Sequence, residues 1–227
     1  MTEDTLRREI VKFGGLLYAR GLAHGSAGNL SVRLDDGAIL VTPTNSSLGS
    51  LTPERISKVS LDGDLMAGDP PSKEAFFHLA VYEERPAANA IVHLHSTYAV
   101  AVSCICHNDT VNVLPPLTAY QMMRVGPLPL VPYYRPGDRK LADAVRGLAG
   151  EHKAMLLANH GPIVSGTSLQ DAVHAYEELE ETAKLFFLIG NRPVSLLTCE
   201  EVSNLNEAFP ASLGVAGGRL NRKPRTV

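Results

Sequence analysis

The sequence predicts an α/β protein with one domain and a central sheet whose strands are mostly antiparallel. Three observations support this fold class. Helix-like and short strand-like segments alternate along the 227 residues, hairpin signals join neighbouring strands, and the sequence lacks the regular strand–helix–strand repeat of a dinucleotide-binding fold. With 44% hydrophobic and 20% charged residues, the composition is typical of a globular protein that buries a sizeable core.

The N-terminal part predicts a helix followed by a hairpin. Apolar residues at helical spacing predict a helix over residues 6–17, with Gly21 as its stop. Residues 29–33 alternate as a strand does, Asp35-Asp36-Gly37 is a strong turn signal, and residues 38–42 provide the partner strand.

A short helix, a second hairpin and a longer helix follow. The short helix opens at Thr52-Pro53-Glu54, and Asp62-Gly63 signals the hairpin. We expect Ser72 to be the N-cap of a helix from Lys73 to about Glu84, which must end before Pro86.

The middle of the chain alternates between apolar and Pro-rich segments. Ala90 to His95 predicts a strand, and a helix follows from Thr97 to about Cys106. We expect residues 115–136 to form loops and one short strand, 128–131, and Asp138 to cap a helix that ends near Leu148.

Two strands and two helices complete the predicted fold. The apolar run 154–158 predicts a strand that enters Asn159-His160-Gly161, and residues 162–165 return from that turn. Periodicity predicts a long helix over 169–189 and a weaker one over 200–208.

Composition excludes several classes of function. The net charge of -3 gives no basic surface for nucleic acid or an acidic membrane, and no apolar run approaches the ~20 residues that cross a bilayer. Three cysteines fit no disulfide framework and predict a reducing cytoplasm. We expect Cys104 and Cys106 to be buried thiols rather than a metal or redox pair.

We also expect residues 1–210 to form the domain and residues 211–227 to form a flexible tail.

Three histidines at the ends of apolar strands suggest a metal site. His93 and His95 share a face if the strand continues, with Cα atoms roughly 6.5 Å apart, and His160 leaves another strand. Three imidazoles leave one coordination position open, as in catalytic zinc sites. The alternative for the pair alone is two unrelated histidines at a strand end.

Glu74 is the natural acid–base partner of such a metal. It is expected in the first turn of its helix, where the helix dipole favours a carboxylate. An ordinary helix-start charge is the alternative, but beside a metal the carboxylate could be a ligand or move a proton.

Two loops and one helix start could bind an anion. Ser26-Ala27-Gly28-Asn29 and Thr44-Asn45-Ser46-Ser47 present backbone N–H groups and short polar side chains, and Ser72 adds donors at a helix N-terminus. Either loop alone could be a plain turn. Together with a metal, they predict a substrate with phosphate at one end and a carbonyl or hydroxyl group at the metal.

Five motifs resemble the class II aldolase/adducin family in order and spacing, over about residues 5 to 210. They are His24-Gly25-Ser26-Ala27-Gly28-Asn29, Thr42-Pro43-Thr44, Pro71-Ser72-Lys73-Glu74, His93-Leu94-His95 and Asn159-His160-Gly161. The resemblance implies a three-layer α/β/α domain around an antiparallel-rich sheet. It also implies a cyclic homotetramer with active sites between subunits.

The same resemblance implies the roles of individual residues. Zinc would be held by His93, His95 and His160, with Glu74 as acid–base residue, and the substrate phosphate would bind Gly28, Asn29, Thr44, Asn45 and Ser72. Mn²⁺, Co²⁺ and Fe²⁺ also suit imidazole ligands. A tyrosine from a neighbouring subunit assists catalysis in this family, and Tyr120 is the positional candidate.

Lys73 departs from the sugar-phosphate aldolase pattern, which has a second serine at this position. A cation there could bind a substrate carboxylate as well as phosphate, or could be a solvated lysine. With the segment Pro132–Asp138, it resembles the branch of the family that decarboxylates 3-oxo-tetronate 4-phosphates. The implied substrate is a small phosphorylated sugar acid, the expected product is dihydroxyacetone phosphate, and the alternatives are a sugar-phosphate aldolase, a 4-epimerase or an adducin-like binding module.

Overall fold

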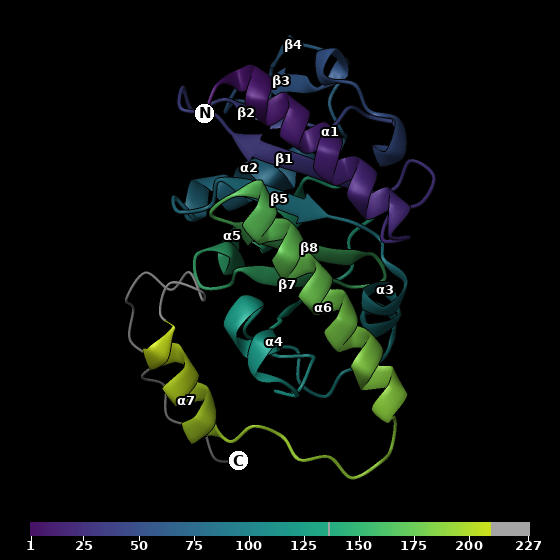
Figure 1. The fold of residues 1–227 in the computed structure, drawn as a ribbon, viewed down its shortest axis with the longest axis vertical. Coiled ribbons are helices and arrows are strands. Elements are labelled where there is room, and N and C mark those ends of the chain that lie inside the picture. Colours follow the sequence, from purple (N-terminus) through teal and green to yellow (C-terminus); the bar gives the residue numbers. More distant parts are fainter. Residues whose placement is uncertain (136, 210–227) are drawn as a thin grey trace.

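An eight-stranded sheet forms the centre of the protein, in the order β4-β3-β2-β1-β5-β8-β7-β6 (Figure 1). We analysed a computed structural model, which describes residues 1–135 and 137–209; the predicted tail, residues 211–227, lies outside them. The strands are β1 (Asn29–Arg33), β2 (Ile39–Val41), β3 (Ser57–Val59), β4 (Leu65–Ala67), β5 (Ala90–His93), β6 (Leu130–Val131), β7 (Ala154–Leu157) and β8 (Gly161–Gly166). Each neighbouring pair is antiparallel except β6 with β7, which confirms the predicted sheet type.

Helices cover both faces of this sheet. The helices in the described part of the chain are α1 (Glu3–Ala19), α2 (Ala75–Glu84), α3 (Thr97–Cys104), α4 (Ala119–Arg124), α5 (Lys140–Ala149), α6 (Leu169–Ile189) and α7 (Cys199–Ala208), with 3-10 turns η1 (Leu48–Ser50) and η2 (Pro53–Arg55). Helices α1, α3 and α6 share one hydrophobic core with Val92, whereas α2 and α5 share a second core with its neighbour Ile91. Because successive strand residues point to opposite faces, this division confirms the three-layer α/β/α architecture, and Figure 1 shows α1 and α6 across one face.

Most of the predicted elements are confirmed. The first hairpin pairs Ser31 with Val41 and turns at Gly37, whose φ of 86° explains the need for glycine. The long helix α6 has the predicted bounds, with the Ser168 side chain accepting a hydrogen bond from the backbone N–H of Asp171. No helix in the described part of the chain is both long and apolar enough to span a membrane.

The start of α2 differs from the prediction. The helix begins at Ala75, and Glu74 rather than Ser72 occupies the N-cap position. The backbone N–H of Ser72 donates to the Thr42 carbonyl at 3.1 Å, next to a bridge between Pro43 and Pro71. Because these contacts hold the chain at Ser72 against the 42–43 segment, the helix starts later.

Three other boundaries are also corrected. Strand β5 ends at His93, so His95 lies beyond it, and α3 ends at Cys104. Cys104 and Cys106 are exposed rather than buried, because the chain leaves the core where α3 ends. The N-cap of α5 is Arg139, although Asp138 accepts a hydrogen bond from the backbone N–H of Lys140 at 3.0 Å.

Helix α4 lies inside the segment that we predicted as loops. Thr118 and Gln121 form a capping box, in which each side chain accepts a hydrogen bond from the backbone of the other. The helix packs against α6 and α7. The capping-box pattern was visible in the sequence, but the surrounding prolines obscured it.

Candidate functional site

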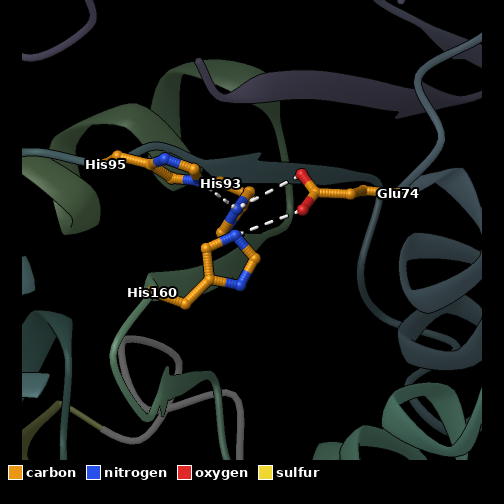
Figure 2. Close-up of side chains that lie close together, drawn as sticks. All are labelled: Glu74, His93, His95 and His160. Carbon is orange, nitrogen blue, oxygen red and sulfur yellow. Dashed lines mark hydrogen bonds and ion pairs between the residues drawn. The ribbon is translucent and has the colours of Figure 1, made fainter. Parts of the chain in front are cut away.

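Four side chains from three parts of the fold converge at one end of the central strands (Figure 2). Glu74 precedes α2, His93 ends β5, His95 follows two residues later, and His160 lies in the turn between β7 and β8. One nitrogen or oxygen atom from each lies within 4.8 Å of the corresponding atoms of the others. The Nε2 atoms of His93 and His95 are 3.1 Å apart, and Glu74 lies 3.4 Å from His93 Nε2 and 3.2 Å from His160 Nε2.

The hydrogen bonding of His93 indicates which of its nitrogens carries a proton. Its Nδ1 lies 2.9 Å from the carbonyl oxygen of Pro162, which can only accept. Nδ1–H is therefore the donor, which leaves Nε2 as the ring nitrogen available to a metal, and burial lowers the pKa of this imidazole to about 3. This nitrogen points toward the Glu74 carboxylate and His95, an arrangement typical of a histidine that binds a metal through Nε2.

His95 is held by contacts on either side of it, because it lies outside the sheet. Tyr176 donates to the carbonyl of Leu94 at 3.0 Å, and Ser96 donates to a carboxylate oxygen of Glu180 at 2.6 Å. Burial, followed by nearby His160, lowers the pKa of His95 to about 4, which favours its neutral, metal-binding form.

The carboxylate of Glu180 also caps α3. It accepts hydrogen bonds from the backbone N–H groups of Tyr98 at 2.9 Å and Ala99 at 2.8 Å. These are donors that the first turn of a helix cannot satisfy itself. Glu180 thereby links α6 to the segment that carries His95.

The opposite end of α3 holds His160. Ser103 accepts two hydrogen bonds from the turn: its carbonyl from the N–H of Asn159 at 3.0 Å, and its Oγ from the N–H of His160 at 3.2 Å. Asn159 has a φ of 55°, the left-handed conformation that asparagine tolerates better than most residues. This turn directs His160 toward the other three groups (Figure 2).

Glu74 is ionised in this setting. Burial opposes its charge, but interactions with His93 and His160 and a 2.7 Å hydrogen bond from Asn29 Nδ2 favour it more strongly. The pKa of this carboxyl therefore lies well below its usual range. Three imidazoles and a carboxylate form a donor set that fits zinc and other divalent first-row metals.

Several residues predicted to bind substrate lie on segments that contact one another or His93. Thr44 and Ser72 are on adjacent segments, since the N–H of Thr44 donates to Pro70 and that of Ser72 to Thr42. Asn45, in the Thr44 loop, has a φ of 54°. A Cβ added to Gly28 would lie 2.8 Å from the carbonyl oxygen of His93, so this glycine packs directly behind a metal-ligand candidate.

Three other candidates have distinct positions. Lys73 is exposed beside Glu74. Asn29 is buried, and both ends of its amide make hydrogen bonds within the protein. Tyr120 is exposed on α4, and among the described residues it makes no hydrogen bond to Glu74 or to the three histidines.

A buried polar chain beside Glu74 was not predicted. It includes His78 and Tyr82 on α2 and Ser31 on β1. The spacing of Glu74, His78 and Tyr82, four residues each, places them on one side of a helix. That spacing was the available signal, but its strand partners could not be identified without the fold.

Comparison with known proteins shows what the whole chain is similar to. The chain matches the Class II Aldolase and Adducin N-terminal domain over residues 8–187. A 3-oxo-tetronate 4-phosphate decarboxylase from Escherichia coli K12 is 53% identical over 203 residues, which cover 89% of this chain and 96% of the relative. The L-fuculose phosphate aldolase of the same organism is 35% identical over 213 residues, covering 92% and 96%. The crystal structure of YgbL from Klebsiella pneumoniae superimposes with a TM-score of 0.89 at 54% identity, covering 90% of this chain and 99% of that one.

Proposed function

The chain belongs to the class II aldolase and adducin family, and we propose that within this family it is a 3-oxo-tetronate 4-phosphate decarboxylase. One observation carries the assignment: identity to a decarboxylase of that name is 53%, against 35% to the fuculose phosphate aldolase, at nearly full coverage of both. The protein is thus an enzyme that breaks a carbon–carbon bond. The complete Glu74, His93, His95 and His160 group supports catalysis over an adducin-like binding role.

The three histidines would hold the metal. One ring nitrogen of each converges with the Glu74 carboxylate, which supports zinc, with Mn²⁺, Co²⁺ or Fe²⁺ as alternatives. A divalent metal bound there would supply Lewis-acid stabilisation of the negative charge that develops on the ketone oxygen of the substrate.

The protein's own residues then handle the proton and the anionic groups. Loss of CO₂ from a 3-oxo acid leaves a carbon that must take up one proton to give dihydroxyacetone phosphate. Glu74, which accepts hydrogen bonds in its ionised form, takes this proton from solvent water and delivers it to that carbon. Tyr120 of a neighbouring subunit is the second candidate for this step.

The remaining candidates bind the two ends of the substrate. Gly28, Asn29, Thr44, Asn45 and Ser72 contribute N–H and hydroxyl donors for the phosphate. The paired backbone of the 42–44 and 70–72 segments supports this assignment, because it joins the loop of Thr44 to the segment of Ser72. Lys73 is exposed next to Glu74, and its ammonium group orients the carboxylate that leaves as CO₂.

We infer three further properties of the enzyme. Residues 1–210 form the catalytic domain, in line with the family match over residues 8–187. The enzyme is a homotetramer with active sites between subunits, which would let the exposed Tyr120 of one subunit reach the active site of another. It works in the cytoplasm, which the free cysteines favour.

The decisive experiment is CO₂ release from 3-oxo-tetronate 4-phosphate by the zinc-loaded protein, with a chelated sample as the control. Chelator-sensitive CO₂, matched by dihydroxyacetone phosphate, is the expected result. Aldol cleavage or epimerisation of a ketose phosphate without CO₂ would keep the site and replace the reaction. In the same assay, His95→Ala should lose both bound zinc and turnover; full turnover would refute the ligand assignment.

A further inference from the structure

A ladder of polar side chains joins α2 to β1 behind the active site. Glu74, His78 and Tyr82 recur every four residues along α2 and its N-cap, and Asn29 and Ser31 recur every two along β1. Four residues of helix advance about 6 Å, and two residues of strand advance about 6.6–6.8 Å. Because these repeats nearly match, each of the two strand side chains lies between two side chains of the helix series.

The hydrogen bonds of the ladder follow this alternation from end to end. Asn29 bridges Glu74, at 2.7 Å, and His78, at 2.5 Å. Ser31 in turn bridges His78, at 2.7 Å, and Tyr82, at 2.8 Å. Apart from Glu74, these side chains are buried.

The acceptor capacity of each group sets the direction of these bonds. Ionised Glu74 can only accept, so the Nδ2 end of Asn29 faces it, and the Oδ1 end faces His78. That oxygen can only accept, so His78 Nε2 carries the proton. In a neutral imidazole, Nδ1 then accepts from Ser31, whose oxygen accepts from Tyr82.

A proton on His78 Nε2 in turn favours the Asn29 orientation that turns the amide Nδ2 toward Glu74. The two ends of an asparagine side chain are nearly the same size, and with the amide reversed its oxygen would lie against the carboxylate. A donor at His78 Nε2 favours the observed orientation, because it needs an acceptor at the opposite end of the amide. When His93 and His160 use their Nε2 atoms to bind a metal, Asn29 is the remaining side-chain donor that the described residues give to Glu74.

We propose that His78 is a positioning residue of this enzyme, which holds the Glu74 carboxylate in its working orientation through Asn29. This inference rests on the proposed function only in assigning Glu74 to the reaction. It assigns Asn29 the task of orienting Glu74 with its side chain, which leaves only its backbone for the substrate phosphate.

Two amide variants separate the positioning role from a merely structural one. In His78→Gln, the side-chain NH₂ can occupy the position of Nε2 and still donate to Asn29. In His78→Asn, the shorter amide reaches only the position of Nδ1, so the donor to Asn29 is lost. Both variants are neutral and polar, and urea unfolding identifies any difference in stability between them.

Turnover and zinc affinity test the proposal. We expect His78→Gln to keep kcat within about threefold of the parent. His78→Asn should lower kcat about 10- to 100-fold, the usual range for residues that orient active-site ligands. In both variants, KM for 3-oxo-tetronate 4-phosphate should change less than about threefold. Equal kcat in the two variants, or a KM rise that accounts for the loss, would overturn the positioning role.

The same variants remain informative if the parent releases no CO₂. That result refutes the proposed function, and the zinc dissociation constants then judge the ladder. Tenfold weaker zinc binding by His78→Asn, with His78→Gln near the parent, supports the role of His78 in placing Glu74 beside the histidines. Equal zinc affinity would overturn it.

Discussion

Glu180 offers the most direct test of how the fold holds the site. Its carboxylate accepts three hydrogen bonds, from Ser96 Oγ, Tyr98 N and Ala99 N, in a buried location. In Glu180→Gln, one carboxylate oxygen becomes an NH₂ group, so at least one of these donors faces another donor. Loss of one buried hydrogen bond to a charged group costs about 1.5–3 kcal/mol.

The expected shift can be measured by urea unfolding at fixed protein concentration. With an m-value of about 2 kcal/mol/M, a loss of that size lowers the midpoint by roughly 1 M. Zinc affinity should fall as well, because the capped segment contains His95. An unchanged midpoint with an unchanged m-value would refute the role that we assign to Glu180.

Thr182 supplies a matched control on the same helix. It is also buried, but its Oγ1 has no hydrogen-bond partner among the described residues. Thr182→Val keeps the shape of the side chain and removes an unsatisfied hydroxyl. We therefore expect the free energy of unfolding to stay the same or to rise by up to about 1 kcal/mol, with the urea midpoint unchanged or higher. A loss as large as that of Glu180→Gln would mean that this part of α6 is sensitive to any substitution.

Three other predictions concern pH, the glycine behind His93 and the lysine beside Glu74. Burial lowers the pKa of His78 to about 4 and that of His93 to about 3, whereas these histidines bind protons near pH 6.5 in the unfolded chain. The metal-free protein should therefore lose stability as the pH falls from 7 to 5, by up to about 1.4 kcal/mol per pH unit for each histidine. Urea midpoints that do not change with pH would contradict this. Gly28→Ala should weaken zinc binding and turnover at least tenfold, because φ is +82° and the new Cβ would lie 2.8 Å from the His93 carbonyl oxygen; normal zinc titration and kcat would show that the backbone can yield there. Lys73→Ser should reduce turnover of the carboxylated substrate more than binding of a simple ketose phosphate, and equal losses in the two assays would mean that Lys73 does not contact the carboxylate.

The sequence predicted those parts of the molecule whose signals are local. Helix α6 could be bounded because its periodicity continues from Leu169 to Ile189, and Asp35-Asp36-Gly37 identified a hairpin whose turn requires a positive φ at Gly37. The four residues that could hold a metal were predicted because each histidine follows an apolar run and Glu74 was expected at a helix start, and the structure brings them together.

The features that sequence reasoning missed depend on contacts between distant segments. The start of α2 is set by the pairing of Ser72 with Thr42, thirty positions away by residue number. His95 was placed on the strand, whereas contacts from α6 to its neighbours Leu94 and Ser96 hold it beyond the strand end. The role of His78 required knowledge that β1 lies beside α2, because its partners are Asn29 and Ser31.

Helix α3 gives the site an unexpected cooperativity. Ser96, the residue after His95, is the N-cap of α3 and donates a hydrogen bond to Glu180. Near the other end of the helix, Ser103 accepts a hydrogen bond from the backbone N–H of His160. Opening of this one short helix by local unfolding would displace two of the three proposed ligands in a single event. Bound metal must therefore stabilise α3 against local unfolding. In turn, unfolding of α3 must weaken metal binding, so the two equilibria are coupled.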